Sequence, residues 1–470
     1  MLLEGLEIIE IKLSELERTV RVDSEFYSRK NIDVLEKLVS KNSFPITDFV
    51  SVADGNHMTI SDDYCDDGGV PYYRGTDIYN FFIEQSTSPL RIKRSAFDGK
   101  NMKRSHLQKG DVLMSIVGAI VGNLALVTTN NEATCSCKLA IMRPSNIDSE
   151  FLAIYLKSYF GQNQIQKFKR GAAQTGLILE DFNQIYIPNF TTPFIENVSK
   201  LVNKSYELTE QTKLAYSQAK NLLLETLGMV DFSPSAEKVN IKSFKDSFAA
   251  TSRLDAEYYQ PRFEEYNQLV ISNPKGFTTI NHEYDLVKTA SHRDKAAYNY
   301  IEIGDVDVSS GSASFNRVER DDLPDNAKLE VMHGDLLISK VRPNRGAVAI
   351  INFDDTDLIV SGAFTVMREK AGSIFANETL KVLLRTAIYK DWLLKFNVGT
   401  QYPVIRDEDV LNLPIPKIDV ETQTKIAALV QQSFELKAQS ERLPDAAKQA
   451  VEKAIETDED AALAWLASIH

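Results

Sequence analysis

Cysteine is scarce in this chain of 470 residues, which contains only Cys65, Cys135 and Cys137. Three cysteines do not make a disulfide framework, and Cys135-x-Cys137 has no second pair with which to complete a zinc site. Histidine is also rare and lacks the spacing of metal ligands. The histidines stand at positions 57, 106, 282, 292, 333 and 470. We therefore expect neither a metal site nor a bound cofactor.

Long apolar runs are absent as well. No uninterrupted apolar stretch approaches the ~18 residues that a membrane-spanning helix needs. Residues 1–20 carry acidic side chains early, and they lack the basic region and the small-residue cleavage site of a signal peptide. These absences predict a cytoplasmic protein without a membrane partner.

The familiar motifs of catalysis are missing too. No G-x-x-x-x-G-K-[ST] loop occurs, so ATP-driven movement is not encoded here. No N/D-P-P-[FY] motif occurs, which adenine methyltransferases use to hold a flipped base. Gly118 and Gly122 stand in a strand region, not in the strand-to-helix turn of a phosphate site. We predict a protein that is not an enzyme, with no catalytic residue.

Basic residues are fewer than acidic residues. The chain has 53 Lys and Arg against 66 Asp and Glu, which gives a formal net charge of −13. This balance argues against a protein that coats nucleic acid unaided, although it allows a basic cleft on an acidic body. The length predicts two or more domains.

The longest feature that is present is segment 193–228, which has no internal proline or glycine. Apolar residues recur in it at steps of four and three, which predicts a stripe for one partner helix. Ser205 and Thr212 interrupt this stripe. About 35 residues at ~1.5 Å each give a rod of roughly 50 Å. The predicted seam residues of this helix, which we place over 191–228, are Val198, Leu201, Leu208, Ala215 and Leu222.

A second stripe with the same spacing runs from Val420 to about Glu456. Pro444 lies inside it, and a proline removes one backbone hydrogen bond from a helix. We therefore expect the second helix to bend or restart at Pro444. The predicted seam residues of this helix are Ile426, Leu429, Leu436 and Leu443.

The rest of the chain contains one set of motifs twice, in the same order. Each later copy follows its earlier copy by about half the chain length, which chance rarely produces over five matches. Three of the five pairs are Val22–Tyr27 with Leu254–Tyr259, Lys109–Ser115 with His333–Ser339, and Phe168–Gly171 with Phe396–Gly399. The Gly-Asp of the middle pair predicts a turn before an apolar strand. We infer an internal duplication.

The two copies of the repeated segment alternate with the two long helices along the chain. We predict an α+β fold in which two similar globular domains are separated by two long antiparallel helices, a coiled-coil spacer with an approximate two-fold axis. The predicted boundaries are 1–190 for the first domain, 191–228 for the first helix, 229–416 for the second domain, and 417–470 for the second helix and tail.

This organisation resembles the specificity subunit of bacterial and archaeal type I restriction–modification systems. The resemblance is carried by the repeated D-x-E-[FY]-Y opening, the K/H-G-D-[LV]-L-x-S strand, the loops Gly171–Gln174 and Gly399–Gln401, and the I-x-I-P exits into the long helices. It implies two target-recognition domains, each of which reads one half of a bipartite sequence in double-stranded DNA. It also implies two DNA adenine methyltransferase subunits docked on the helices, with motor–nuclease subunits that complete the complex. Catalysis would then belong to the partners.

A second interpretation stays open, in which the chain is a protein scaffold that joins two partner subunits without reading DNA. The acidic charge balance favours this alternative slightly. Reversal of charge at Arg342 and Arg345 distinguishes the two interpretations, because only a DNA reader depends on these side chains for binding.

The DNA-binding candidates are basic and amide side chains near the loops in which the two copies differ. An arginine can donate two hydrogen bonds to a guanine edge, and a glutamine amide can pair with an adenine edge. Arg342-Pro-Asn-Arg345 follows the second Gly-Asp strand, whereas the corresponding segment Val117–Ile120 is apolar. We therefore expect the two domains to contact DNA differently. The candidates are Arg74, Lys103, Arg104, Lys138, Lys169, Arg170 and Gln174 in the first domain, and Arg293, Lys340, Arg342, Arg345 and Gln401 in the second.

Overall fold

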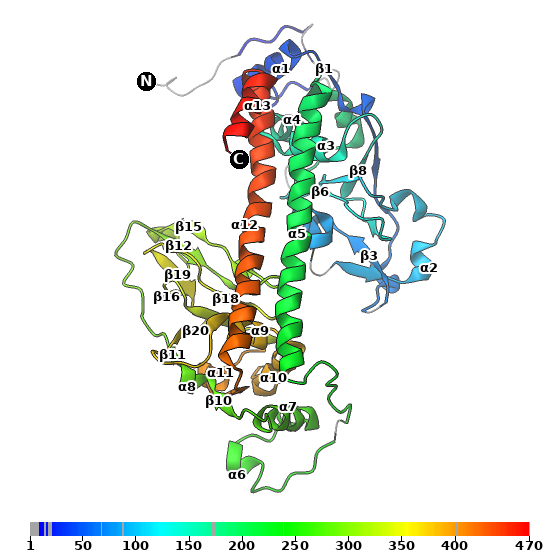
Figure 1. The fold of residues 1–470 in the computed structure, drawn as a ribbon. Coiled ribbons are helices and arrows are strands. Elements are labelled where there is room, and N and C mark those ends of the chain that lie inside the picture. The colour runs from blue at the N-terminus through cyan, green and yellow to red at the C-terminus, as the bar shows by residue number, and fades with distance from the viewer. Residues whose placement is uncertain are drawn as a thin grey trace. The chain divides into compact units, whose positions relative to one another are not determined.

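A computed structural model describes residues 9–13, 16, 21–66, 68–86, 89–171, 175–237, 239–399 and 403–469. The chain divides into two compact units. The first unit comprises residues 1–208 and 438–470, and the second comprises residues 209–437. The division falls inside two long helices, α5 (Thr192–Thr226) and α12 (Val420–Glu456), so each unit contains one half of each helix (Figure 1).

The described residues of the first unit form three small sheets. Its central sheet is antiparallel with the strand order β2-β8-β5-β6, and the other two have the orders β4-β3-β7 and β1-β9. The strands are β1 (Ser43–Pro45), β2 (Val50–Asp54), β3 (Val70–Tyr73), β4 (Leu90–Ile92), β5 (Val112–Ser115), β6 (Leu124–Leu126), β7 (Thr134–Cys135), β8 (Leu139–Pro144) and β9 (Tyr186–Pro188). The helices of this unit are α1 (Arg29–Ser40), α2 (Arg94–Phe97), α3 (Ser149–Lys157), α4 (Tyr159–Phe168) and the C-terminal α13 (Glu459–Ser468).

The second unit repeats this plan. Its central sheet has the order β11-β20-β17-β18, and beside it are sheets with the orders β15-β12-β19-β16, β10-β21 and β13-β14. The strands are β10 (Phe277–Thr279), β11 (Tyr284–Leu286), β12 (Ala297–Ile301), β13 (Val306–Asp307), β14 (Ser312–Ala313), β15 (Asn316–Glu319), β16 (Ala327–Glu330), β17 (Leu336–Ser339), β18 (Val348–Ile350), β19 (Leu358–Ser361), β20 (Phe364–Glu369) and β21 (Pro414–Pro416). The helices are α6 (Phe248–Thr251), α7 (Pro261–Ile271), α8 (Ile280–Glu283), α9 (Asn377–Leu384), α10 (Ala387–Leu393) and α11 (Asp407–Leu411).

The two Gly-Asp motifs begin the equivalent strands β5 and β17, as predicted. Gly110 and Gly334 both have a left-handed φ, of 93° and 86°, which glycine adopts without a Cβ penalty. All four residues of each strand are buried. In β5, Val112 and Met114 join the core beneath α3 and α4, while Leu113 joins a second core on the opposite face. Burial on both faces explains why these strands are apolar throughout and do not alternate with polar residues.

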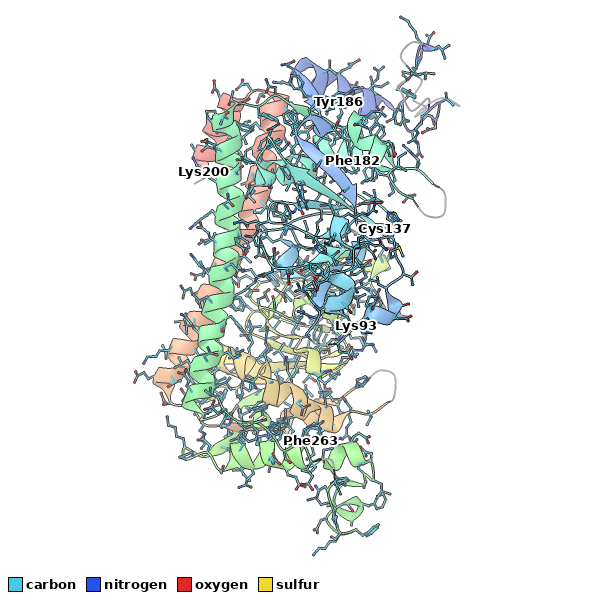
Figure 2. The ribbon with its side chains drawn as sticks, turned by 90° about the vertical axis from the view of Figure 1, so that its right-hand side faces the viewer. Lys93, Cys137, Phe182, Tyr186, Lys200 and Phe263 are labelled. Atoms are coloured by element: carbon cyan, nitrogen blue, oxygen red, sulfur yellow. The ribbon has the colours of Figure 1, made fainter. Side chains whose placement is uncertain are left out.

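The halves of α5 and α12 pack in opposite directions within each unit, as the predicted antiparallel pair requires. In the first unit, the start of α5 shares a core with the end of α12, through Val198, Val202, Ala447 and Val451. In the second unit, the end of α5 shares a core with the start of α12, through Ala219, Leu223, Ile426 and Val430. Lys200, on the other face of α5, is exposed and points away from the sheets (Figure 2).

The buried stripe differs in detail from the predicted seam. Of the predicted residues, Val198, Leu208, Ala215 and Ile426 are buried, and Leu201, Leu222, Leu429, Leu436 and Leu443 are partly buried. Val202, Leu223 and Val430, one position further along, are fully buried in the cores. A straight α-helix has 3.6 residues per turn, so its buried stripe drifts away from a strict seven-residue repeat.

Pro444 does not end α12, which continues through it as one helix of 37 residues. The expected restart at this position is therefore wrong. Pro444 has no N–H to donate to the carbonyl of Ser440, four residues earlier. Ser205 of α5 supplies a donor, because its Oγ donates to Ser440 O at 2.6 Å and both serines are buried. The polar interruption of the stripe thus satisfies the carbonyl that the proline leaves without its helical partner.

A related hydrogen bond joins the helices in the second unit. Ser433 Oγ of α12 donates to Thr212 O of α5 at 3.3 Å, and both residues are buried. The spacing from Ser205 to Ser433 equals the spacing from Thr212 to Ser440, so the two bonds are equivalent in the duplicated frame. None of the described helices combines the length and the apolar character that crossing a membrane requires.

We expect Ser205→Ala to destabilise the chain by about 1–3 kcal/mol, because it removes the buried donor that stands in for the N–H that Pro444 lacks. The cost should fall below about 1 kcal/mol in a Pro444→Ala background, where a backbone N–H returns. Urea unfolding of the four proteins of this cycle measures the difference. Ser433→Ala is the matched control, because Thr212 O keeps a helical partner. Equal costs of Ser205→Ala in both backgrounds would contradict this account of Pro444.

Candidate nucleic-acid interface

Each unit fixes its central sheet with the aspartate of its Gly-Asp turn. Asp111, 1% exposed, accepts hydrogen bonds from Arg143 Nε at 2.7 Å and Nη2 at 2.8 Å. Asp335, 0% exposed, accepts the same pair from Arg368 at 2.7 and 2.8 Å. These bonds raise the pKa of both guanidinium groups. The two-pronged geometry compensates for burial of the carboxylate, so this repeated pair holds β5 to β8 and β17 to β20.

Two candidate arginines of the first unit are held by acids of the same unit. Arg74 Nη2 lies 3.1 Å from Asp77 Oδ1. Arg104 Nη2 lies 2.7 Å from Asp54 Oδ1 and donates to Gly55 O at 3.1 Å. Both guanidinium groups stay partly exposed and keep further N–H donors. The carboxylates partly neutralise the charge of these two guanidinium groups and also fix their orientation. A fixed orientation favours a contact of defined geometry over general electrostatic attraction to phosphate.

The other candidates of the first unit lie in three settings. Arg170 pairs with the buried Asp181. Lys103 and Lys138 are exposed, which is the ordinary state of lysine and also the state that a phosphate contact needs. Gln174 lies outside the described residues.

Two candidates of the second unit are likewise held in place. Arg293 has a left-handed φ of 50°, and its Nη2 donates to Pro324 O at 2.7 Å and Ala327 O at 2.9 Å. Lys340 Nζ lies 3.2 Å from a carboxylate oxygen of Asp407. Neither cation is therefore an unattached surface charge.

The Arg342–Arg345 loop has a constrained backbone. Arg342 has a left-handed φ of 49°, a short 3₁₀ helix spans Pro343–Arg345, and Gly346 follows with a φ of 77°. Arg345 is exposed and Arg342 is partly exposed. Two left-handed residues on either side of a proline make this loop rigid and specific in direction. Gln401 lies outside the described residues.

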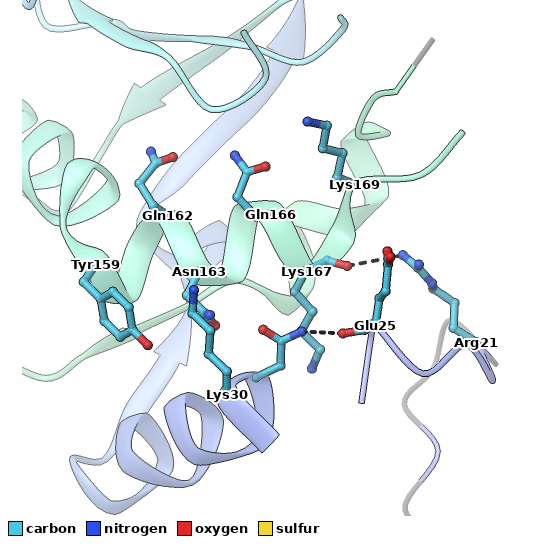
Figure 3. A pocket seen from close by; sticks show the side chains of 10 residues that line it. Arg21, Glu25, Lys30, Tyr159, Gln162, Asn163, Gln166, Lys167 and Lys169 are labelled. Carbon is cyan, nitrogen blue, oxygen red and sulfur yellow. Dashed lines mark hydrogen bonds between the residues drawn. The ribbon is translucent and has the colours of Figure 1, made fainter. Parts of the chain in front are cut away.

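A polar pocket of about 250 Å³ lies in the first unit, where α4 meets α1 (Figure 3). Four cations and one acid contribute to its wall, together with amides and one tyrosine. The lining residues are Arg21, Glu25, Lys30, Asn31, Tyr159, Gln162, Asn163, Gln166, Lys167 and Lys169. Such donors suit a phosphate group or another anion.

Several of these side chains are already held by neighbours. Arg21 donates to Asp23 at 2.7 and 2.9 Å, which lowers the pKa of that carboxyl. Lys30 Nζ lies 5.3 Å from the centre of the Tyr159 ring. Asn163 is 6% exposed, and its Oδ1 is a buried acceptor without a partner in this part of the chain. The pocket therefore offers both donors and an acceptor.

Sequence reasoning pointed to Lys169 but missed most of this pocket. Arg21 and Lys30 come from the start of the chain, and only the fold brings them to α4. The signal on α4 itself is a polar stripe, since Gln162, Gln166 and Lys169 recur at helical spacing. No set of three or more His, Cys, Asp and Glu residues suited to a metal occurs among the residues that the structure describes.

Residues 39–189 match the family model of the type I restriction modification DNA specificity domain. The match covers the sheets, α3 and α4 of the first unit. Over these residues, the chain is similar to that DNA specificity domain. The match includes the Gly-Asp strand and the loop that follows Arg170, on which the resemblance rests.

A curated relative is similar to the chain over a shorter stretch. The chain is 30% identical over 111 residues to the type I restriction enzyme HindI specificity subunit of Haemophilus influenzae. This alignment covers 23% of the present chain and 24% of the relative. The matched region thus spans about a quarter of the length of that specificity subunit.

Two solved structures align with most of the chain at low identity. One is the S subunit of a type I restriction–modification system from M. genitalium, with 10% identity, a TM-score of 0.41, and coverage of 88% of this chain and 94% of that one. The other is the HsdS subunit from Thermoanaerobacter tengcongensis, with 15% identity, a TM-score of 0.28, and coverage of 88% and 96%.

Arg368→Leu should destabilise the chain by about 1.5–3 kcal/mol, because it leaves Asp335 buried with a charge and without its guanidinium partner. The double variant Asp335→Leu/Arg368→Leu should recover part of this loss, since no buried charge remains. Denaturant unfolding measures both. The matched control is Arg317→Leu, which removes an exposed arginine of the same unit. A double variant less stable than Arg368→Leu would contradict this account.

Proposed function

We propose that this chain is the DNA-sequence-specificity subunit of a type I restriction–modification complex, and that each unit reads one half of a bipartite site. The family match covers only the first unit. The observation that carries the proposal is the strand order of that unit, β2-β8-β5-β6, which recurs in the second unit as β11-β20-β17-β18. Two copies of a DNA specificity domain suit a double-stranded DNA target with two parts.

The two units differ in their loops, which is where recognition of two unlike half-sites requires them to differ. The segment after β17 contains Arg342 and Arg345, whereas the equivalent segment after β5 is the apolar Val117–Ile120. The second unit also has the additional strand β16 beside β19. A repeated frame with different loops is the usual construction of binding proteins that share a scaffold but not a target.

We further propose that the outer faces of α5 and α12 bind two DNA adenine methyltransferase subunits, and that motor–nuclease subunits complete the complex. The outer face of α5 is charged, with Lys204 and Glu207 3.4 Å apart and Lys213 and Glu210 2.7 Å apart. A charged, exposed face on a long helix suits a polar protein interface. In this proposal the chain itself carries out no chemistry.

Arg345→Glu should weaken specific DNA binding by the chain assembled with its methyltransferase by about tenfold or more, as expected for one lost arginine–base contact. Fluorescence anisotropy against a cognate duplex measures this. Lys275→Glu is the control matched in charge, because Lys275 pairs with Asp419 away from the loop. Equal affinity of the Arg345→Glu and Lys275→Glu complexes would favour the scaffold interpretation.

Removal of seven residues from each long helix should shorten the gap between the half-sites by about three base pairs, because seven residues span ~10 Å. Mapping of the methylated adenines in a random-sequence library reads the gap directly. An unchanged gap with retained methylation would show that these helices do not determine it. Removal of residues 241–247, outside both helices, is the control.

A further inference from the structure

The second unit contains a buried cluster of cations where α9 meets both long helices. Lys381 of α9 is 0% exposed, and its Nζ lies 3.9 Å from the centre of the Phe434 ring of α12 and 5.7 Å from that of Tyr216 of α5. Arg385, just after α9, places its guanidinium carbon 4.7 Å from the centre of the Tyr216 ring. The rings compensate part of the cost of burying these cations.

Four buried atoms of this cluster have no hydrogen-bond partner within the part of the chain that the structure describes. They are Lys381 Nζ, Arg385 Nε, Arg385 Nη1 and Tyr216 OH. Arg385 Nη2, in contrast, donates to Val308 O at 2.8 Å and Ser309 O at 2.9 Å. The two guanidinium nitrogens can only donate, and the lysine nitrogen and the hydroxyl can donate as well, so an acceptor is the group that satisfies all four.

The charges around the cluster also favour an anionic acceptor, because positive charge is in excess. Lys437 of α12 is bound to Asp307 at 2.7 Å and to Ser310 at 3.2 Å, so it engages one of the two carboxylates that act on Lys381. Burial, together with Arg385 and Lys437, lowers the pKa of Lys381 well below its usual range, while Glu378 and Asp307 act in the opposite direction. An arginine stays charged under all these conditions, so the site holds uncompensated positive charge.

The first unit shows that the fold does not require this cluster. Segments 149–171 and 377–399 align without a gap, and Ser158 and Thr386 cap the equivalent helices α4 and α10. In this alignment the residue equivalent to Lys381 is Ala153, which is also fully buried. Burial of a lysine costs folding free energy, and the first unit folds with an alanine at the equivalent position. Packing alone therefore does not explain the lysine in the second unit.

We propose that Lys381, Arg385 and Tyr216 form a buried site for a small inorganic anion of the size of chloride or bromide. An anion accepts from all four donors and balances their charge, whereas a water molecule adds two hydrogens of its own and no charge. Gly311 closes one side of the site, since a Cβ there would lie 1.6 Å from Arg385 Nη1 and 2.6 Å from Lys381 Cε. This tight wall favours a monatomic ion over phosphate. The bound ion would tie α9 to both long helices.

Crystals grown or soaked in bromide test the position of the ion. We expect an anomalous-difference peak within hydrogen-bonding distance of Lys381 Nζ and Arg385 Nε. The same experiment on Lys381→Met should give no peak there. Absence of the peak in the wild-type chain would overturn the proposal.

Thermal unfolding in solution tests binding without a crystal. At constant ionic strength, replacement of gluconate by chloride should raise the Tm of the wild-type chain in a saturable way, because the ion binds only the folded state. The rise should disappear in Lys381→Met and persist in Lys157→Met, a variant at the first-unit position equivalent to Arg385. An identical rise in all three proteins, or none in the wild type, would overturn the proposal.

Tyr216→Phe covers the case in which Lys381→Met does not fold. It keeps the ring beside Arg385 and removes one donor, so it should shift the chloride midpoint of the Tm curve to severalfold higher concentration. An unshifted midpoint would exclude Tyr216 from the site.

Discussion

The pairing of α5 with α12 is the constraint on which the rest of the structure depends, because each unit builds its core on one half of both helices. Apolar stripes supply the burial, but they do not by themselves fix how far one helix slides along the other. The buried hydrogen bonds from Ser205 and Ser433 do so, since each reaches one particular carbonyl of the other helix. A slide by one turn would break the hydrogen bond from Ser205 Oγ to the Ser440 carbonyl. Buried polar positions that cost stability can specify register in this way.

The two units share a frame and differ in what they add to it. Both bury an aspartate against an arginine of the neighbouring strand, with the same pair of distances. At an equivalent buried position, however, one unit has Ala153 and the other Lys381. A duplicated gene can change one copy in this manner while the other continues to show what the fold itself needs. Comparison of the two units therefore distinguishes residues that the shared fold needs from residues that only one unit has added. This comparison requires no sequence other than that of the chain itself.

The sequence was sufficient for features whose cause is local. Two long helices follow from a lack of breakers and from apolar spacing, and the strands β5 and β17 follow from Gly-Asp turns before apolar residues. The path of α12 through Pro444 was not predictable, because the compensating donor Ser205 lies 235 residues before the carbonyl of Ser440 that it satisfies. The same limit applies to the candidate arginines. Arg104 finds its acid 50 residues earlier, so only the fold shows that its charge is engaged.

The division of the chain inside its long helices has a consequence for synthesis. The second unit is one continuous segment, residues 209–437, whereas the first needs residues 438–470 to complete its core. As the chain leaves the ribosome, the second unit can close while the first still lacks Val451 and Ile455. The N-terminal unit is thus translated first but finishes folding last, and a premature stop near the C-terminus would damage this unit before it affected the second unit.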